Sequence, residues 1–163
     1  MTSSREKIEP LTPGNRLVTE FSIQTMKKEI RHPDKEFTYG LFSAGVSCDG
    51  WLFVSGQGPL DMKSGNRVPG TIEEETVRTL NNLDRVLGEA GYTRDDVVKC
   101  TCYLADMDDF EGFNRAYGEF FTGVRPARTT VGAQLMKSIR IEIDAIARHS
   151  GGTGLENPAD RRR

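Results

Sequence analysis

The 163-residue sequence is poor in the features that define several classes of protein. It has no apolar run long enough to cross a bilayer, and its first residues lack the apolar segment and small-residue cleavage site of a signal peptide. A formal charge of -2 provides no surplus of positive charge for binding phosphates. Composition therefore predicts a cytoplasmic protein of one main domain, with a small-molecule partner and neither nucleic acid nor membrane.

Cysteine and histidine are both scarce, which narrows the possible chemistry. Cys48, Cys100 and Cys102 form an odd set without a C-x-x-C pair, so we interpret them as buried thiols rather than disulfides. Only His32 and His149 are available, which argues against a Ser-His or Cys-His nucleophile and against a zinc centre. The sequence also lacks the G-x-S-x-G, H-E-x-x-H, P-loop and G-x-G-x-x-G motifs. We expect no bound metal.

The two ends of the chain differ in composition from its middle. Residues 1–25 are polar and show neither helical nor strand periodicity, so we expect an N-terminal extension. Residues 149–163 combine Gly, Pro and charge with almost no apolar side chain, which is typical of a flexible tail. The folded domain is expected to span residues 26–148.

The middle of the chain alternates between strand and helix patterns. Asp49-Gly50 separates two short apolar runs and is a hairpin signal, and Thr71 with Glu74 forms a capping box before an amphipathic helix. The expected strands cover residues 26–30, 44–48, 51–55, 97–105, 128–135 and 139–147, and the expected helices cover residues 71–90 and 108–121. This order predicts an α+β layer sandwich, in which two helices cover one face of a mixed β-sheet.

Apolar side chains indicate which sides of these segments face the core. The strand over residues 97–105 is expected to bury Val98, Cys100, Cys102 and Leu104. The second helix carries an aromatic stripe that we interpret as core and that consists of Phe110, Phe113, Tyr117 and Phe120. Gly91 and Gly123 are placed to end the two helices.

The last two strands carry the candidate site. If a three-residue turn joins them as a hairpin, Gly132 pairs with Glu142, and one face of the sheet carries Arg128, Thr130, Glu142 and Asp144. Arg128 then lies about 13 Å along the strands from Glu142. The two side chains can act on one small substrate only if one of them comes from a neighbouring chain, which predicts an oligomer with sites at its interfaces.

The chemistry of these side chains permits two interpretations. The planar guanidinium of Arg128 matches a carboxylate through two parallel hydrogen bonds, and Glu142 is a candidate general base. Alternatively, Arg128 forms an interfacial salt bridge, for example with Asp144, and Glu142 is one more member of a charge network. Residue chemistry by itself favours the salt bridge.

A resemblance reverses that preference. Five segments resemble, in order and spacing, the Rid/YjgF family of reactive intermediate deaminases, which includes 2-iminobutanoate/2-iminopropanoate deaminases. The segments are SAGVSCDGWLFVSGQGPLD, TIEEETVRTLNNLDRVLGEAG, VVKCTCYLADMDDFEGFNRAYGEFF, RPARTTV and IEIDAIA. The resemblance implies a chorismate-mutase-like α+β fold, assembled as a homotrimer around a central barrel with three sites between subunits. It also implies hydrolysis of enamines and imines, such as 2-aminoacrylate and 2-iminopropanoate, to 2-keto acids and ammonia without a cofactor.

The same resemblance implies roles for individual residues. Arg128 of R-P-A-R-T would bind the substrate carboxylate, and Glu142 of I-E-I-D-A would orient the attacking water. The residues that would line or support the pocket are Ser55 and Gly56 of S-G-Q, Asn114 of D-F-x-x-x-N, and Thr130, which stands where many relatives have cysteine. Phe42 stands where many relatives have tyrosine, and the link over residues 136–138 lacks the usual L-P-K turn.

These departures leave substrate choice open. A larger substrate such as 2-aminomuconate is one alternative, and a non-catalytic, chaperone-like trimer that senses carboxylate metabolites is another. Members of the family are also labelled endoribonucleases, an activity that the acidic pI and the lack of a histidine pair disfavour here.

Overall fold

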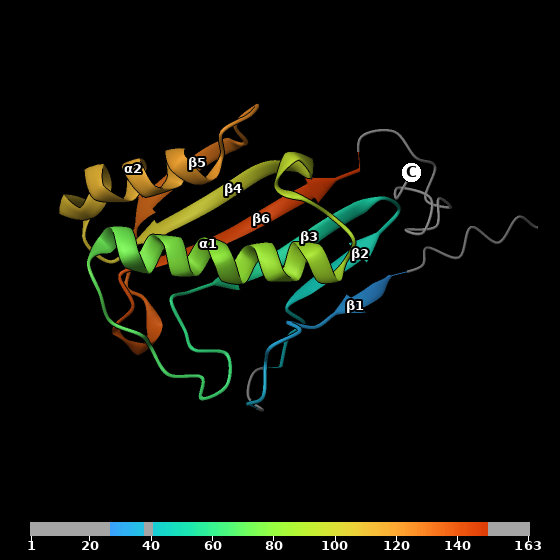
Figure 1. The fold of residues 1–163 in the computed structure, drawn as a ribbon, viewed down its shortest axis with the longest axis horizontal. Coiled ribbons are helices and arrows are strands. Elements are labelled where there is room, and N and C mark those ends of the chain that lie inside the picture. The colour runs from blue at the N-terminus through green and yellow to red at the C-terminus, as the bar shows by residue number, and fades with distance from the viewer. Residues whose placement is uncertain (1–26, 38–40, 150–163) are drawn as a thin grey trace, which may run out of the picture.

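The fold is a single mixed sheet covered on one face by two helices (Figure 1). The computed structural model describes residues 27–37 and 41–149, so the extension over residues 1–25 and the tail beyond residue 149 lie outside the described residues. The strands are β1 (Lys28–Ile30), β2 (Gly45–Cys48), β3 (Trp51–Gln57), β4 (Val97–Leu104), β5 (Ala127–Gly132) and β6 (Ile141–Arg148). The helices are α1 (Ile72–Glu89) and α2 (Phe110–Phe120), with short 3-10 turns at Arg94–Asp96, Met107–Asp109 and Met136–Ser138. This architecture confirms the predicted α+β layer sandwich.

Local signals placed several element ends correctly. The Thr71 hydroxyl caps α1 by accepting a hydrogen bond from the Glu74 backbone N–H. The Glu74 carboxylate in turn accepts a hydrogen bond from the Thr71 backbone N–H. Gly91 follows the helix with a φ of +81°, the left-handed conformation that ends many helices. The turn between β2 and β3 has positive φ at both Asp49 and Gly50, as a two-residue hairpin of this hand requires.

The core lies between the sheet and the helices. The helices contribute Leu80, Leu83, Leu87 and Phe113, and the strands contribute Leu52, Cys100, Cys102, Leu104, Ile141 and Ile143, all fully buried. Burial raises the pKa of Cys100 to about 11 and that of Cys102 to about 12, so both remain neutral thiols in the core. The prediction that Val98 faces the core was wrong, because an irregularity in pairing between Val97 and Lys99 turns Val97 inward instead.

The predicted hairpin of the last two strands was also wrong. β6 pairs antiparallel with both β3 and β4, whereas β5 pairs in parallel with β4 at the edge of the sheet. Every second residue of β6 is fully or almost fully buried, so this strand is most stable in the centre. β5 has no fully buried residue and takes the edge, where the α2 crossover returns the chain parallel to β4.

This topology changes which side chains share a face. Arg128 pairs with the buried Cys100, so Arg128 and Thr130 point to the helix side of the sheet. Glu142 and Asp144 alternate with buried residues of β6 and point to the open face. The expectation that these four side chains lie on one face was therefore wrong, because β4 separates the two strands and the parallel register with β4 determines the direction of Arg128.

No helix within the described residues combines the length and the apolar character that crossing a membrane would require.

Candidate active site

Three of the predicted site residues lie together on the open face of the sheet. The backbone of Gly56 in β3 is so close to Glu142 in β6 that a methyl group on Gly56 would lie 2.8 Å from Glu142 Cδ and closer still to Oε1. The neighbouring Ser55 hydroxyl donates to the Ser43 carbonyl at 2.7 Å, which holds the segment before β2 against β3. That segment also carries Phe42, a residue that is 66% exposed. We call Ser55, Gly56 and Glu142 the face group.

The surroundings of Glu142 raise its proton affinity. Partial burial raises the pKa of this carboxyl above its ordinary value, and the negative charge of Asp144 raises it further. Asp144 lies two residues along the same face and accepts a hydrogen bond from the Tyr103 hydroxyl at 3.1 Å. A carboxylate with raised proton affinity at a partly wet surface is suited to accept a proton from water.

Arg128 lies at the other side of the sheet, on its β5 edge. Its guanidinium carbon is 4.7 Å from the centre of the Tyr117 ring and 4.9 Å from that of Phe113. Within residues 27–37 and 41–149, no carboxylate lies at ion-pair distance from Arg128. Arg128 and Asp144 of one chain point to opposite faces of the sheet and form no salt bridge with each other, and the salt bridge at an interface stays a prediction.

Within residues 27–37 and 41–149, three titratable groups respond to the charge of Arg128, namely Cys100, Cys102 and Tyr117, and all three are neutral. The thiols of Cys100 and Cys102 are buried, with pKa values of about 11 and 12. Burial also raises the pKa of Tyr117 above its ordinary value, which keeps the phenol protonated. A half-buried cation among neutral groups gains from any anion that reaches it from outside, such as a ligand carboxylate.

Two further predicted residues accompany Arg128. Thr130 follows on the same side of β5, and its buried hydroxyl oxygen has no hydrogen-bond partner in the described part of the chain. Asn114 is half-buried on α2, between Phe110 and Tyr117 on the stripe that faces Arg128. We call Arg128, Thr130 and Asn114 the edge group.

The fold separates the edge group from the face group. Arg128 is in register with Cys100, and Cys100 is in register with Ala145, three residues from Glu142 and two strands away. The Cα atoms of Arg128 and Glu142 are therefore on the order of 14 Å apart, with side chains on opposite faces of the sheet. A single chain does not bring both side chains to one small ligand.

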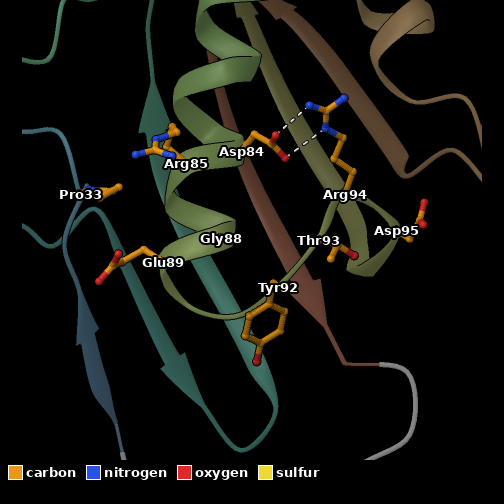
Figure 2. Close-up of a pocket in the computed structure, with 9 residues that line it drawn as sticks. All are labelled: Pro33, Asp84, Arg85, Gly88, Glu89, Tyr92, Thr93, Arg94 and Asp95. Atoms are coloured by element: carbon orange, nitrogen blue, oxygen red, sulfur yellow. Dashed lines mark hydrogen bonds and ion pairs between the residues drawn. The ribbon is translucent and has the colours of Figure 1, made fainter. Parts of the chain in front are cut away.

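Two surface hollows lie elsewhere on the described part of the chain. Figure 2 shows one beside the end of α1, where the Arg94 guanidinium donates to the Asp84 carboxylate at 2.8 and 3.1 Å. A second hollow lies between α1 and the loop near Asp61. Neither is lined by a residue of the edge group or the face group.

Comparison with known proteins shows the family to which the chain belongs. Residues 34–149 match the family described as endoribonuclease L-PSP. The chain belongs to this family, the Rid/YjgF family. A RutC family protein of Pyrococcus horikoshii is 40% identical over 123 residues, which cover 75% of this chain and 98% of the relative. The 2-iminobutanoate/2-iminopropanoate deaminase of Mus musculus is 43% identical over 109 residues, which cover 66% of this chain and 81% of the relative.

Solved structures of Rid/YjgF proteins have the same fold. The YjgF gene product of E. coli superposes with a TM-score of 0.70 at 32% identity, covering 76% of this chain and 99% of that one. E. coli TdcF, solved with bound serine, gives a TM-score of 0.71 at 30% identity and covers 76% of this chain and 100% of that one.

Sequence reasoning missed two parts of this Rid/YjgF site. The aromatic stripe of α2 was assigned to the core alone, although Phe113 and Tyr117 also contact Arg128. A signal was present, since the strand after this helix carries an arginine within reach of the stripe. The effect of Asp144 on Glu142 was also missed, because Asp144 was considered only as a partner for Arg128.

Proposed function

We propose that this Rid/YjgF protein hydrolyses small 2-imino acids and their enamine tautomers to 2-keto acids and ammonia. The observation that carries the proposal is Arg128, a half-buried guanidinium that packs on aromatic rings and has no ion-pair partner within the described residues. Such a cation suits a small carboxylate held by two parallel hydrogen bonds. The deaminase name of the mouse relative and its 43% identity support the same reaction.

The reaction needs little more than orientation and one proton acceptor. With its carboxylate on Arg128, the protonated imine presents an electrophilic carbon to a water molecule next to Glu142. The water oxygen bonds to the imine carbon while one of its protons passes to the Glu142 carboxylate. That proton then moves to the nitrogen. As the C–N bond breaks, the Glu142 carboxylate takes the remaining hydroxyl proton and the carbonyl forms. The departing ammonia then accepts this proton, so the products are the 2-keto acid and an ammonium ion. Atoms balance with no cofactor and no metal.

The separation of Arg128 from Glu142 leads us to propose that the active site lies between subunits of a homotrimer. In the sheet formed by the described residues, β5 is an edge strand with one unpaired side, so a neighbour can bring its own open face to this edge. The open face carries exposed apolar side chains that a neighbour would cover, including Phe53 at 48% and Val131 at 40% exposure. The edge group of one subunit would then meet the face group of the next.

An imine-trapping assay tests the reaction. An amino-acid oxidase generates 2-iminopropanoate in situ, semicarbazide traps the free imine, and the protein is expected to divert the imine to pyruvate. Arg128→Ala should lower kcat/KM by at least about 100-fold, because about 2.7 kcal/mol of charge-assisted hydrogen bonding is lost. Glu142→Gln should lower it by about 100-fold or more, as is typical of a lost proton acceptor.

Arg148→Ala is the matched control, because the exposed Arg148 also lies over an aromatic ring, that of Trp51 at 4.9 Å, but lies outside both groups. It should leave activity within about twofold. Equal activity of the wild type and Arg128→Ala would exclude the proposed role of Arg128. Light scattering that shows a monomer at the assay concentration would exclude a site between subunits.

A further inference from the structure

The guanidinium of Arg128 rests on a set of aromatic rings that α2 presents to β5. The Tyr117 and Phe113 ring centres lie 4.7 and 4.9 Å from the guanidinium carbon, and Phe110 lies at 5.9 Å. The rings also support one another, with centres 5.6 Å apart for Phe113 and Tyr117 and 4.8 Å apart for Tyr117 and Phe121. Phe113 is fully buried and Tyr117 is 4% exposed, so their rings have little freedom to move.

An aromatic ring and a carboxylate hold an arginine side chain in different ways, because only the carboxylate uses the N–H donors. An ion pair uses N–H donors of the guanidinium, whereas a ring face attracts the cation through its quadrupole and accepts none of the in-plane donors. The rings beside Arg128 therefore leave its fork of N–H groups available for a ligand. They also restrict the approach, because a carboxylate must arrive at the edge of the guanidinium that the rings leave open.

A second arginine that packs against α2 provides a comparison. Arg94 lies 3.9 Å above the ring of Phe120, but its Nε and Nη2 donate to Asp84 (Figure 2). Its donors are used within the subunit, as expected of a structural contact. Ring contact by itself thus does not distinguish Arg128. The distinction is that Arg128 combines ring contact with the lack of an ion-pair partner among the described residues.

We propose that Phe113 and Tyr117 are positioning residues, which hold the Arg128 guanidinium in the orientation that selects a carboxylate ligand. This inference rests on the proposed carboxylate-binding role of Arg128. The two side chains act through Arg128 and do not touch the reacting atoms. Removal of either ring should therefore weaken the preference of the site for a carboxylate ligand over an uncharged one.

The test measures that preference directly, as the ratio of the dissociation constants for 2-oxobutanamide and 2-oxobutanoate by titration calorimetry. Tyr117→Leu should reduce the ratio by about tenfold, because it removes a ring contact with a desolvated cation. Tyr117→Phe keeps the ring and should keep the ratio. Phe120→Leu is the matched control, because it removes a ring from the same helix and from the other arginine contact, and should also keep the ratio.

Each result decides the matter. A ratio unchanged in Tyr117→Leu, or reduced equally in Phe120→Leu, would overturn the inference, and so would a wild type without preference for the carboxylate. If Tyr117→Leu does not fold, Phe110→Leu replaces it, because Phe110 is only half-buried; its ratio should fall by a few-fold, and an unchanged ratio would again overturn the inference. Because binding is measured without turnover, a wild type that binds the keto acid but converts no imine would refute the proposed function and leave this inference standing.

Discussion

Gly56 provides a stringent test of the face group, since its backbone lies against the side chain of Glu142. In Gly56→Ala the new methyl group would lie 2.8 Å from Glu142 Cδ, 3.0 Å from Cγ and closer still to Oε1. Contacts this short do not persist between unbonded atoms, so the carboxylate must move by on the order of 1 Å. The end of a glutamate side chain is flexible, and therefore the movement is achieved without disturbing β3 or β6.

The expected result separates activity from stability. A displacement of about 1 Å in a group that acts on the substrate can lower the rate by about 100-fold, equivalent to about 2.7 kcal/mol of transition-state stabilisation. The free energy of unfolding should change by less than about 1 kcal/mol, because only a side-chain end moves. The imine-trapping assay measures the first quantity, and urea denaturation at a fixed protein concentration measures the second.

Two controls identify the cause. Gly88→Ala lies on α1 with nothing within 4 Å of the added methyl group, so activity should be unchanged and stability should rise by up to about 1 kcal/mol. In a Glu142→Asp background the side chain is one methylene shorter, and the further loss caused by Gly56→Ala should be several-fold smaller. Full activity in Gly56→Ala would refute the role of Glu142. If the free energy of unfolding falls by as many kcal/mol as the transition-state stabilisation, the strand itself is disturbed.

Two further predictions concern charge. Because Glu142 must be ionised to accept a proton, kcat/KM should fall as pH decreases through its raised pKa; removing the negative charge in Asp144→Asn makes ionisation easier and should move this acid limb to lower pH. The carboxylate of Glu75 is fully buried and accepts hydrogen bonds from Arg67 Nε at 3.1 Å and from the Arg140 backbone N–H at 3.0 Å. Because Glu75→Ala leaves the charge of Arg67 without this partner, it should lower the free energy of unfolding, measured by urea denaturation, by about 3–5 kcal/mol.

Each has an outcome that would contradict it. An acid limb that stays in place in Asp144→Asn, or moves to higher pH, would mean that Glu142 does not determine it. The control for Glu75→Ala is Glu89→Ala, which removes an exposed carboxylate from the same helix. This variant should change the free energy of unfolding by less than about 0.5 kcal/mol. Similar changes in the two alanine variants would mean that the contacts of Glu75 contribute little.

Much of the active-site proposal was accessible from the sequence. R-P-A-R-T and I-E-I-D-A singled out Arg128 and Glu142, and the expectation that one subunit cannot bring them to one ligand agrees with their separation in the fold. The reasoning behind that expectation was wrong, since it assumed a hairpin of the last two strands. The separation arises instead from β4, which lies between β5 and β6.

Sequence by itself determined several of the element ends, because those signals act over a few residues. The capping box of Thr71 and Glu74, the Asp49-Gly50 turn and Gly91 each specify a backbone conformation that needs no distant partner. Only the tertiary structure decided which strands are neighbours and which way Arg128 points. Those choices depend on burying the apolar face of β6 in the centre of the sheet, and many distant residues contribute to that free energy at once.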